Sequence, residues 1–208
     1  MLKIPFDFGG DFFRPILKYI CPALMESRQL LSHHALNKTL DRLAYQVFEQ
    51  HIEPNDLAVI ALQPRGVYLG RRILERLKGL YRTDSISYGE LDITFHRDDF
   101  RRRDELLVPA RTNLEFSIES RQIVLIDDVL YTGRTIRAGL DAMLDFGRPA
   151  NVELMALIDR RFSRELPVQP NYTGRVVDVV TDETVKVNWS DDDQNNEVIL
   201  YGSNKTND

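Results

Sequence analysis

The string VLIDDVLYTGRT, residues 124–135, holds two residue patterns that could each bind part of one ligand. Asp127 and Asp128 stand side by side at the end of an apolar run, and TGRT at 132–135 follows where a helix is expected to begin. Backbone N–H groups at a helix start, helped by threonine hydroxyls, bind phosphate. The adjacent acids repel phosphate and need sugar hydroxyls or a divalent cation as partners. The two patterns together favour a phosphorylated sugar.

Two other interpretations of the same string compete with this one. Paired acids after an apolar strand also occur in the magnesium-binding strand of nucleotide hydrolases, but the chain lacks the G-x-x-x-x-G-K-[ST] loop that such enzymes carry. A bare pair of aspartates could simply cap a turn. The complete twelve-residue string favours the phosphorylated sugar over both.

Composition limits the class of protein. The 208 residues, 43% hydrophobic and 28% charged, fit one globular domain with a substantial core. The single cysteine, Cys21, cannot form an internal disulfide, which suits a reducing compartment and predicts a cytoplasmic location. A formal charge of −5 provides no overall basic field, so any RNA binding must come from a local patch.

The two ends of the chain differ from its middle. Residues 1–24 have neither the unbroken apolar run of a signal peptide nor the length of a membrane span. They could form an ordered arm that packs on a partner subunit or a poorly ordered extension, and we expect the extension. Residues 25–190 are predicted to form the folded domain. Residues 191–208 are acidic, with a final strand expected at 197–201.

Between these ends, helix and strand patterns alternate. Ser32 is a candidate N-cap for a helix to about residue 51, and further helices are predicted at 67–80 and 134–146, the last with Ile136, Leu140, Met143 and Leu144 facing inward. Apolar runs such as LAVIAL, QIVLI and VELMAL predict buried strands, while Gly89 is expected to break or bulge the extended segment around it. Such alternation predicts an α/β fold with a mostly parallel central sheet and helices on both faces.

The central string resembles the 5-phosphoribosyl-1-pyrophosphate (PRPP) binding motif of type I phosphoribosyltransferases. The longer DDVLYTGRTIRAGLDAMLDFGRPA, together with GELDITFHRDDF and SRELPVQPNYTGR, resembles the PyrR branch of that superfamily, and the likeness extends over about residues 27–201. It implies the type I fold with a flexible hood. It also implies transfer from PRPP to uracil, giving UMP and pyrophosphate, and binding of a pyrimidine-operon messenger RNA hairpin in response to uridine nucleotides.

The resemblance leaves two further functions open and predicts assembly. One is a nucleotide-sensing RNA-binding regulator with little catalysis, and the other is a purine phosphoribosyltransferase without an RNA role. Proteins of this fold commonly form homodimers or larger homo-oligomers, which we expect here. No membrane partner is expected.

The resemblance also implies roles for individual residues. Asp127, Asp128 and Arg65 would be catalytic, and the two aspartates would hold the ribose hydroxyls directly or through Mg²⁺. The implied PRPP-binding residues are Asp127, Asp128, Val129, Leu130, Tyr131, Thr132, Gly133, Arg134 and Thr135. The implied pyrophosphate loop is Gln63, Pro64, Arg65 and Gly66, in which any cis proline bond would be Gln63–Pro64.

Three further sets complete the implied assignments. The hood, which would close over PRPP and exclude water, carries Arg97, Asp98, Arg101, Arg102 and Arg103. The base-binding residues are Asp159 and Arg160. The RNA-binding candidates are Lys38, Arg42, Arg71, Arg72, Arg76, Arg161, Arg164 and Arg175.

The chain departs from better-known PyrR proteins at two places. They tend to have Lys-Thr-Arg-Gly where this chain has QPRG, so one positive charge is missing beside the pyrophosphate or the RNA. They also tend to have Arg-Gly-His-Arg-Glu-Leu-Pro where this chain has RRFSRELP, which is one residue longer and lacks the histidine. The second difference bears on base recognition and on the RNA surface.

Overall fold

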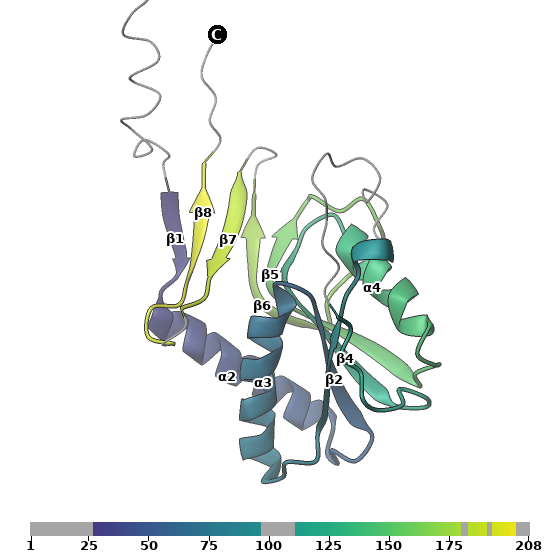
Figure 1. Ribbon diagram of the computed structural model, residues 1–208. Coiled ribbons are helices and arrows are strands. Elements are labelled where there is room, and N and C mark those ends of the chain that lie inside the picture. The colour runs from purple at the N-terminus through teal and green to yellow at the C-terminus, as the bar shows by residue number, and fades with distance from the viewer. Residues whose placement is uncertain (1–26, 97–110, 180–182, 191–192, 203–208) are drawn as a thin grey trace, which may run out of the picture.

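The structure is a computed structural model that describes residues 27–96, 111–179, 183–190 and 193–202 (Figure 1). The predicted extension at 1–24 and the predicted hood residues Arg97, Asp98 and Arg101–Arg103 lie outside this part of the chain. The elements in chain order are β1 Ser27–Leu31, α2 His33–Gln50, β2 Leu57–Leu62, α3 Gly66–Tyr81, β3 Ser87–Leu91, the 3-10 turn η2 Thr94–His96, β4 Gln122–Leu130, α4 Arg134–Leu144, β5 Asn151–Arg161, β6 Tyr172–Asp178, β7 Thr184–Asn188 and β8 Glu197–Tyr201.

The central sheet has five parallel strands in the order β3-β2-β4-β5-β6, which confirms the predicted α/β architecture. Its middle strands carry continuous apolar runs, LAVIAL in β2 and IVLI in β4, because both faces of the sheet are covered there. Val59 and Val124, which are register partners, belong to the core under α2 and α3. Their neighbours Ile60 and Leu125 belong to the core on the other face, with residues of α4. Figure 1 shows α2 and α3 on one side of this sheet and α4 on the other.

A second sheet of three antiparallel strands, in the order β1-β8-β7, stands beside the parallel one (Figure 1). Our sequence analysis did not predict it, because its strands are short and β1 lies far along the chain from β8. Val198 and Leu200 of β8 are buried in the same core as α2, so this sheet packs onto the domain. The division of the chain into extension, domain and acidic segment stays a prediction.

Helix α4 differs from the prediction in the face that it buries. Leu140 and Leu144 are 36% and 63% exposed, so their predicted inward orientation is wrong. The buried face contains Ile136 and Met143, as predicted, together with the small residues Ala138, Gly139 and Ala142. A Cβ on Gly139 would stand 2.8 Å from Leu62 Cδ2. The helix therefore lies too close to β2 for any side chain at Gly139.

The predicted break at Gly89 is also wrong, since Gly89 pairs with Ile60 in an unbroken parallel register. The glycine is needed for another reason. A Cβ at this position would lie 2.2 Å from Leu114 Cδ2 and 3.0 Å from the backbone oxygen of Asn113. Glu90 and Asn113 exchange backbone hydrogen bonds here, so a second segment approaches the strand closely.

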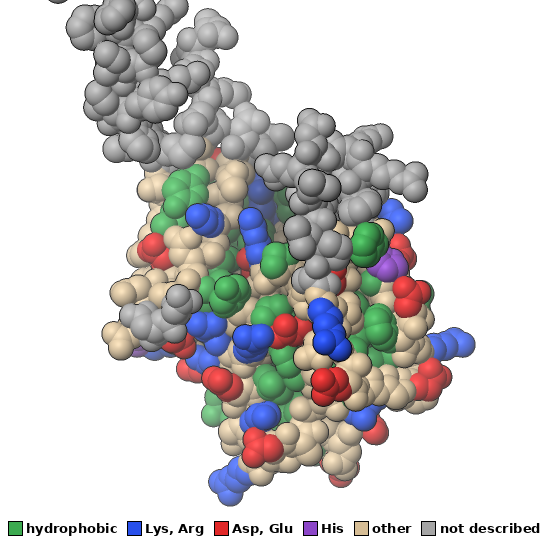
Figure 2. Space-filling view, viewed as in Figure 1, with side chains coloured by type: hydrophobic (Ala, Val, Ile, Leu, Met, Phe, Trp, Pro, Cys, Tyr) green, Lys and Arg blue, Asp and Glu red, His purple; other side chains and the backbone are tan. Residues whose placement is uncertain are grey.

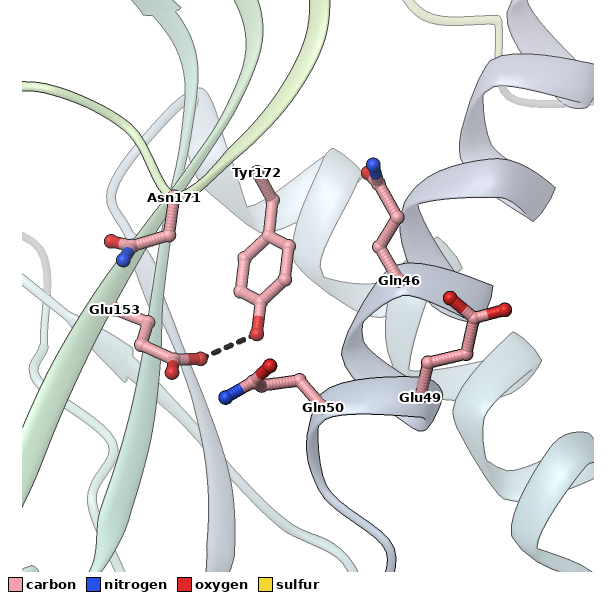
Figure 3. Close-up of a pocket in the computed structure, with 6 residues that line it drawn as sticks. All are labelled: Gln46, Glu49, Gln50, Glu153, Asn171 and Tyr172. Carbon is pink, nitrogen blue, oxygen red and sulfur yellow. Dashed lines mark hydrogen bonds between the residues drawn. The ribbon is translucent and has the colours of Figure 1, made fainter.

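A polar cluster fastens α2 to the amino ends of β5 and β6 (Figure 3). The Glu153 carboxylate, in a residue 8% exposed, accepts a hydrogen bond of 2.5 Å from the Tyr172 hydroxyl and lies 2.8 Å from His51 Nε2. Burial, and then the nearby Glu153, raise the pKa of Tyr172, so the phenol stays protonated and donates. A pocket of about 400 Å³ lies beside the cluster.

No helix in the described ranges combines the length and the apolar character that crossing a membrane requires.

We expect Tyr172→Phe to lower the free energy of unfolding by about 1–3 kcal/mol, because it removes one donor to a buried carboxylate and leaves the rest of the packing in place. Denaturant titration measures this. The matched control is Tyr45→Phe on α2, where the side chain is 53% exposed and a change within about 0.5 kcal/mol is expected. Equal stability of the native chain and Tyr172→Phe would mean that His51 alone satisfies Glu153.

Candidate active site

The paired acids lie inside β4, which continues to Leu130, four residues beyond the predicted strand end at Ile126. Asp127 and Asp128 are 6% and 4% exposed, and Asp127 Oδ1 accepts a hydrogen bond of 2.9 Å from the backbone N–H of Asp128. Burial raises the pKa of Asp128, while the positive charge of Arg65 acts in the opposite direction. Two acids are thus held with little water, at the carboxyl edge where parallel sheets bind ligands.

A cavity of about 580 Å³ opens over these acids. Its walls include residues that the sequence analysis assigned to four different roles: the pyrophosphate loop, the acids, the phosphate loop and the base site. They are Gln63, Pro64, Arg65, Asp127, Asp128, Val129, Tyr131, Thr135 and Arg160. The fold therefore brings together segments that are up to about a hundred residues apart in the sequence.

The phosphate loop has the geometry that the sequence predicts. Gly133 adopts φ 92°, a left-handed conformation that favours glycine, and α4 begins at the next residue. The backbone oxygen of Thr132 accepts hydrogen bonds from the N–H groups of Glu165 and Leu166, at 3.0 and 3.2 Å. A second segment thus braces the loop from outside. The first N–H groups of α4 lie where the loop ends and the helix begins. Such an arrangement can bind an anion.

The QPRG segment connects β2 to α3 beside the acids. The Gln63–Pro64 peptide bond is cis, the position that the sequence analysis named. A Cβ on Gly66 would come within 2.5 Å of the backbone oxygen of Ile126, the residue before the acid pair. Glycine therefore allows the start of α3 to approach β4, which carries Arg65 to the cavity wall.

Six of the predicted site residues within the described ranges do not line the cavity: Gly66, Leu130, Thr132, Gly133, Arg134 and Asp159. Leu130 is 1% exposed and packs in the core under α4. The Arg134 side chain pairs with Glu165 at 2.5 Å on the surface. The Asp159 carboxylate bonds to Arg164, whereas the neighbouring Arg160 lines the cavity. Successive side chains of a strand point to opposite faces of the sheet, so the side chains of the two predicted base-binding residues, Asp159 and Arg160, point in different directions.

Four residues that line the cavity were missed from the sequence. Ile93 and Thr94 follow β3, and Thr184 and Val185 come from β7 of the second sheet. The alternating string TVKVN predicts a strand, but nothing in it indicates which other strand it lies beside. The backbone oxygen of Glu183 accepts a hydrogen bond of 3.0 Å from Arg160 Nη2, which fixes the start of β7 at this wall.

The RNA-binding candidates separate into two groups by their partners. Five of them form ion pairs with carboxylates: Arg71 with Glu90, Arg72 with Asp193, Arg76 with Asp41, Arg161 with Asp178 and Arg164 with Asp159. Basic and acidic side chains accordingly interleave on the face in Figure 2.

The second group is the α2–β6 surface, defined by Lys38, Arg42 and Arg175. Arg42 donates to the backbone oxygens of Thr173 and Gly174, and Arg175 donates to that of Leu30. These acceptors are neutral, so the two guanidinium groups keep their positive charge uncompensated by those contacts. Lys38 is exposed one helical turn before Arg42.

Comparison with known proteins agrees with this geometry. The family described as phosphoribosyl transferase domain matches residues 26–191. The Bifunctional protein PyrR of Elusimicrobium minutum is 42% identical over 169 residues, which cover 81% of this chain and 93% of that protein. The Bifunctional protein PyrR of Bacillus subtilis is 37% identical over 175 residues, 83% of this chain and 95% of that protein.

Solved structures support the fold alone. A hypoxanthine-guanine phosphoribosyltransferase from Bacillus anthracis matches with a TM-score of 0.58 at 15% identity, covering 73% of this chain and 84% of that one. A hypoxanthine phosphoribosyltransferase from Staphylococcus aureus matches with a TM-score of 0.57 at 16% identity, covering 74% and 78%. The chain therefore belongs to the PyrR family of bifunctional proteins, within the type I phosphoribosyltransferase superfamily.

Proposed function

We propose that this protein transfers the phosphoribosyl group of PRPP to uracil, giving UMP and pyrophosphate, and that it also regulates pyrimidine genes by binding their messenger RNA in response to uridine nucleotides. The observation that carries the catalytic half is one cavity in which two buried carboxylates, a helix start and Arg65 converge. PRPP has hydroxyls, a 5-phosphate and a pyrophosphate, and each matches one of these features.

Each part of the cavity has a separate task in this reaction. Asp127 and Asp128 accept hydrogen bonds from the 2- and 3-hydroxyls of the ribose, and Asp128 stabilises the positive charge that develops as the bond to pyrophosphate loosens. The TGRT loop holds the 5-phosphate with its N–H groups. Arg65 faces the departing pyrophosphate. Transfer needs no covalent intermediate, because the protein positions the base against the activated carbon.

Magnesium fits this site as part of a PRPP complex. Among the described residues no group of three or more His, Cys, Asp or Glu side chains could hold a metal alone. Mg²⁺ commonly binds through one or two carboxylates together with substrate phosphates and water, which Asp127, Asp128 and PRPP would provide. When bound it would neutralise charge on the pyrophosphate.

The remaining predicted groups complete the proposal. Arg160 faces the base, while the hood arginines Arg97 and Arg101–Arg103 would cover the pyrophosphate and keep water out. A cytoplasmic location is proposed, since PRPP and messenger RNA would be met there, and a homodimer or larger homo-oligomer is proposed as the working form.

Pyrophosphate release tests the catalytic half. We expect purified protein with PRPP and Mg²⁺ to release pyrophosphate when uracil is present. No release is expected with hypoxanthine, with guanine or in the absence of a base. Asp128→Asn should lower kcat/KM by about 100-fold or more, because a fixed negative charge beside the developing cation is lost.

Asp141→Asn, an exposed change on α4, is the matched control and should leave kcat/KM within about twofold. Full activity of Asp128→Asn would contradict the carboxylate assignment. Turnover with purines only would identify a purine phosphoribosyltransferase. Binding of UMP without turnover would identify a regulator that senses nucleotides.

The pH dependence tests the electrostatic link between Arg65 and the acids. Arg65 lowers the pKa of Asp128 against the larger effect of burial, so Arg65→Gln should raise that pKa further. Because the ionised carboxylate is the active form, the acid limb of the kcat/KM profile should move to higher pH in Arg65→Gln. Both proteins are compared on the same substrates, so that substrate ionisation cancels. An unmoved limb, with lower activity throughout, would show that Arg65 contacts pyrophosphate without influencing Asp128.

The α2–β6 surface is the better candidate for RNA, because Arg42 and Arg175 donate to backbone oxygens and pair with no carboxylate in the described ranges. We expect Lys38→Gln to weaken binding of a pyrimidine-operon hairpin and to reduce the slope of log K against log salt by about 1, the effect of one lost phosphate contact. Uracil transfer should be unchanged. Lys78→Gln on α3, where the lysine pairs with Asp84, is the control and should leave the slope as it is. If Lys78→Gln weakened RNA binding and reduced the salt slope more than Lys38→Gln did, the RNA surface would instead lie on α3.

A further inference from the structure

Arg160 has a feature that its surroundings in the protein do not explain. The residue is 6% exposed, and Nη2 donates to the backbone oxygen of Glu183 at 3.0 Å. Its Nε–H, however, is buried and meets no hydrogen-bond acceptor among the residues that the structure describes. A buried donor of a charged group is costly to leave unsatisfied. Since Arg160 lines the cavity over the acids, an acceptor on a ligand is the natural partner for this N–H.

Tyr131 holds the Arg160 side chain in place. The guanidinium carbon of Arg160 lies 3.9 Å from the centre of the Tyr131 ring, within the range of a cation–π contact. Both residues line the cavity. The ring therefore covers one face of the guanidinium and limits the directions in which its Nε–H can point.

The backbone of Tyr131 is itself held from two sides. Arg164 Nη1 donates to the backbone oxygens of Leu130 and Tyr131, and Arg164 Nη2 bonds to Asp159, the residue before Arg160 in β5. On the other side, the next residue is Thr132, whose backbone oxygen accepts from Glu165 and Leu166. Tyr131 thus joins the phosphate loop to the end of β5.

We propose that Tyr131 is a positioning residue for base recognition: its ring holds the Arg160 guanidinium so that Nε–H donates to a carbonyl oxygen of the base. This inference rests on the proposed transferase function and deepens it. The loop that seats the 5-phosphate then also orients the donor that reads the base. A 2,4-dioxopyrimidine such as uracil supplies the carbonyl acceptors that this N–H requires.

The proposal separates base affinity from PRPP affinity. Tyr131→Leu keeps an apolar side chain but removes the π face, so the guanidinium becomes free to turn. We expect the KM for uracil to rise by about tenfold or more, the loss typical of one hydrogen bond to a charged group, with the KM for PRPP within about twofold. Tyr131→Phe keeps the ring and should restore most of the affinity for uracil.

A double-mutant cycle tests the link directly. Arg160→Lys keeps the charge but has no Nε–H in this position, so it should raise the KM for uracil in the same way. Combining it with Tyr131→Leu should add little, because both changes remove the same contact. Additive effects would overturn the proposal. So would a tenfold rise in the KM for PRPP that matches the rise for uracil, since this would indicate general damage to the loop.

A binding experiment keeps the test independent of turnover. If the native chain does not transfer uracil, the transferase function fails, but calorimetry with UMP and with ribose 5-phosphate still measures the two halves of the site. Tyr131→Leu should weaken UMP by about tenfold and leave ribose 5-phosphate within about twofold. Equal weakening of both ligands, or of neither, would overturn the role of Tyr131. Tyr45→Leu on the surface of α2 serves as the control for an unrelated tyrosine.

Discussion

The burial of two adjacent carboxylates at the end of β4 is the constraint on which the rest of the structure depends. Removing a charged carboxylate from water is costly unless charges or donors nearby compensate. Burial raises the pKa of Asp128, although Arg65 and backbone N–H groups act in the opposite direction, and the backbone N–H of Asp128 also donates to Asp127. The site is therefore suited to a ligand that brings hydroxyl donors or a cation.

Close packing of two helices places the loops around these acids. Gly66 brings the start of α3 against the backbone of Ile126, and Gly139 brings α4 against Leu62. Each contact lies one residue from a functional segment, since Ile126 precedes Asp127 and Leu62 precedes Gln63. A side chain at either glycine would push a helix outward and move Arg65 or the phosphate loop away from the acids. The geometry of the site therefore depends on the close packing of these two helices against the sheet.

Local chemistry in the sequence was enough to predict the parallel sheet and the turn at Gly133, while the family resemblance implied that any cis proline bond in the pyrophosphate loop would be Gln63–Pro64. These features depend on residues that are neighbours in the chain. The second sheet, the wall formed by Thr184 and Val185, and the exposure of Leu140 and Leu144 depend on long-range packing, which no short pattern encodes. The role of Gly89 shows the same limit. A glycine inside a strand indicated that something unusual happens at this position. The cause is the close approach of residues 113–114, which lie more than twenty residues further along the chain.

The segment RRFSRELP, where the chain departs from better-known PyrR proteins, contacts the loop that follows the acids. Arg164 donates to backbone oxygens of Leu130, Tyr131, Arg160 and Val168 and to the Asp159 carboxylate, so its donors are used inside the fold. Few N–H groups of Arg164 therefore remain available to bind an RNA phosphate.

Phe162, in contrast, is 84% exposed and has φ 66°, a left-handed conformation that is unusual for an aromatic residue. A segment one residue longer than in better-known relatives can form such an outward turn before Arg164. The brace formed by Arg164, Glu165 and Leu166 then reaches Tyr131 and Thr132 at the start of the TGRT loop. The outward turn at Phe162 therefore belongs to the outer surface beside the site, while the three residues that follow it support the loop.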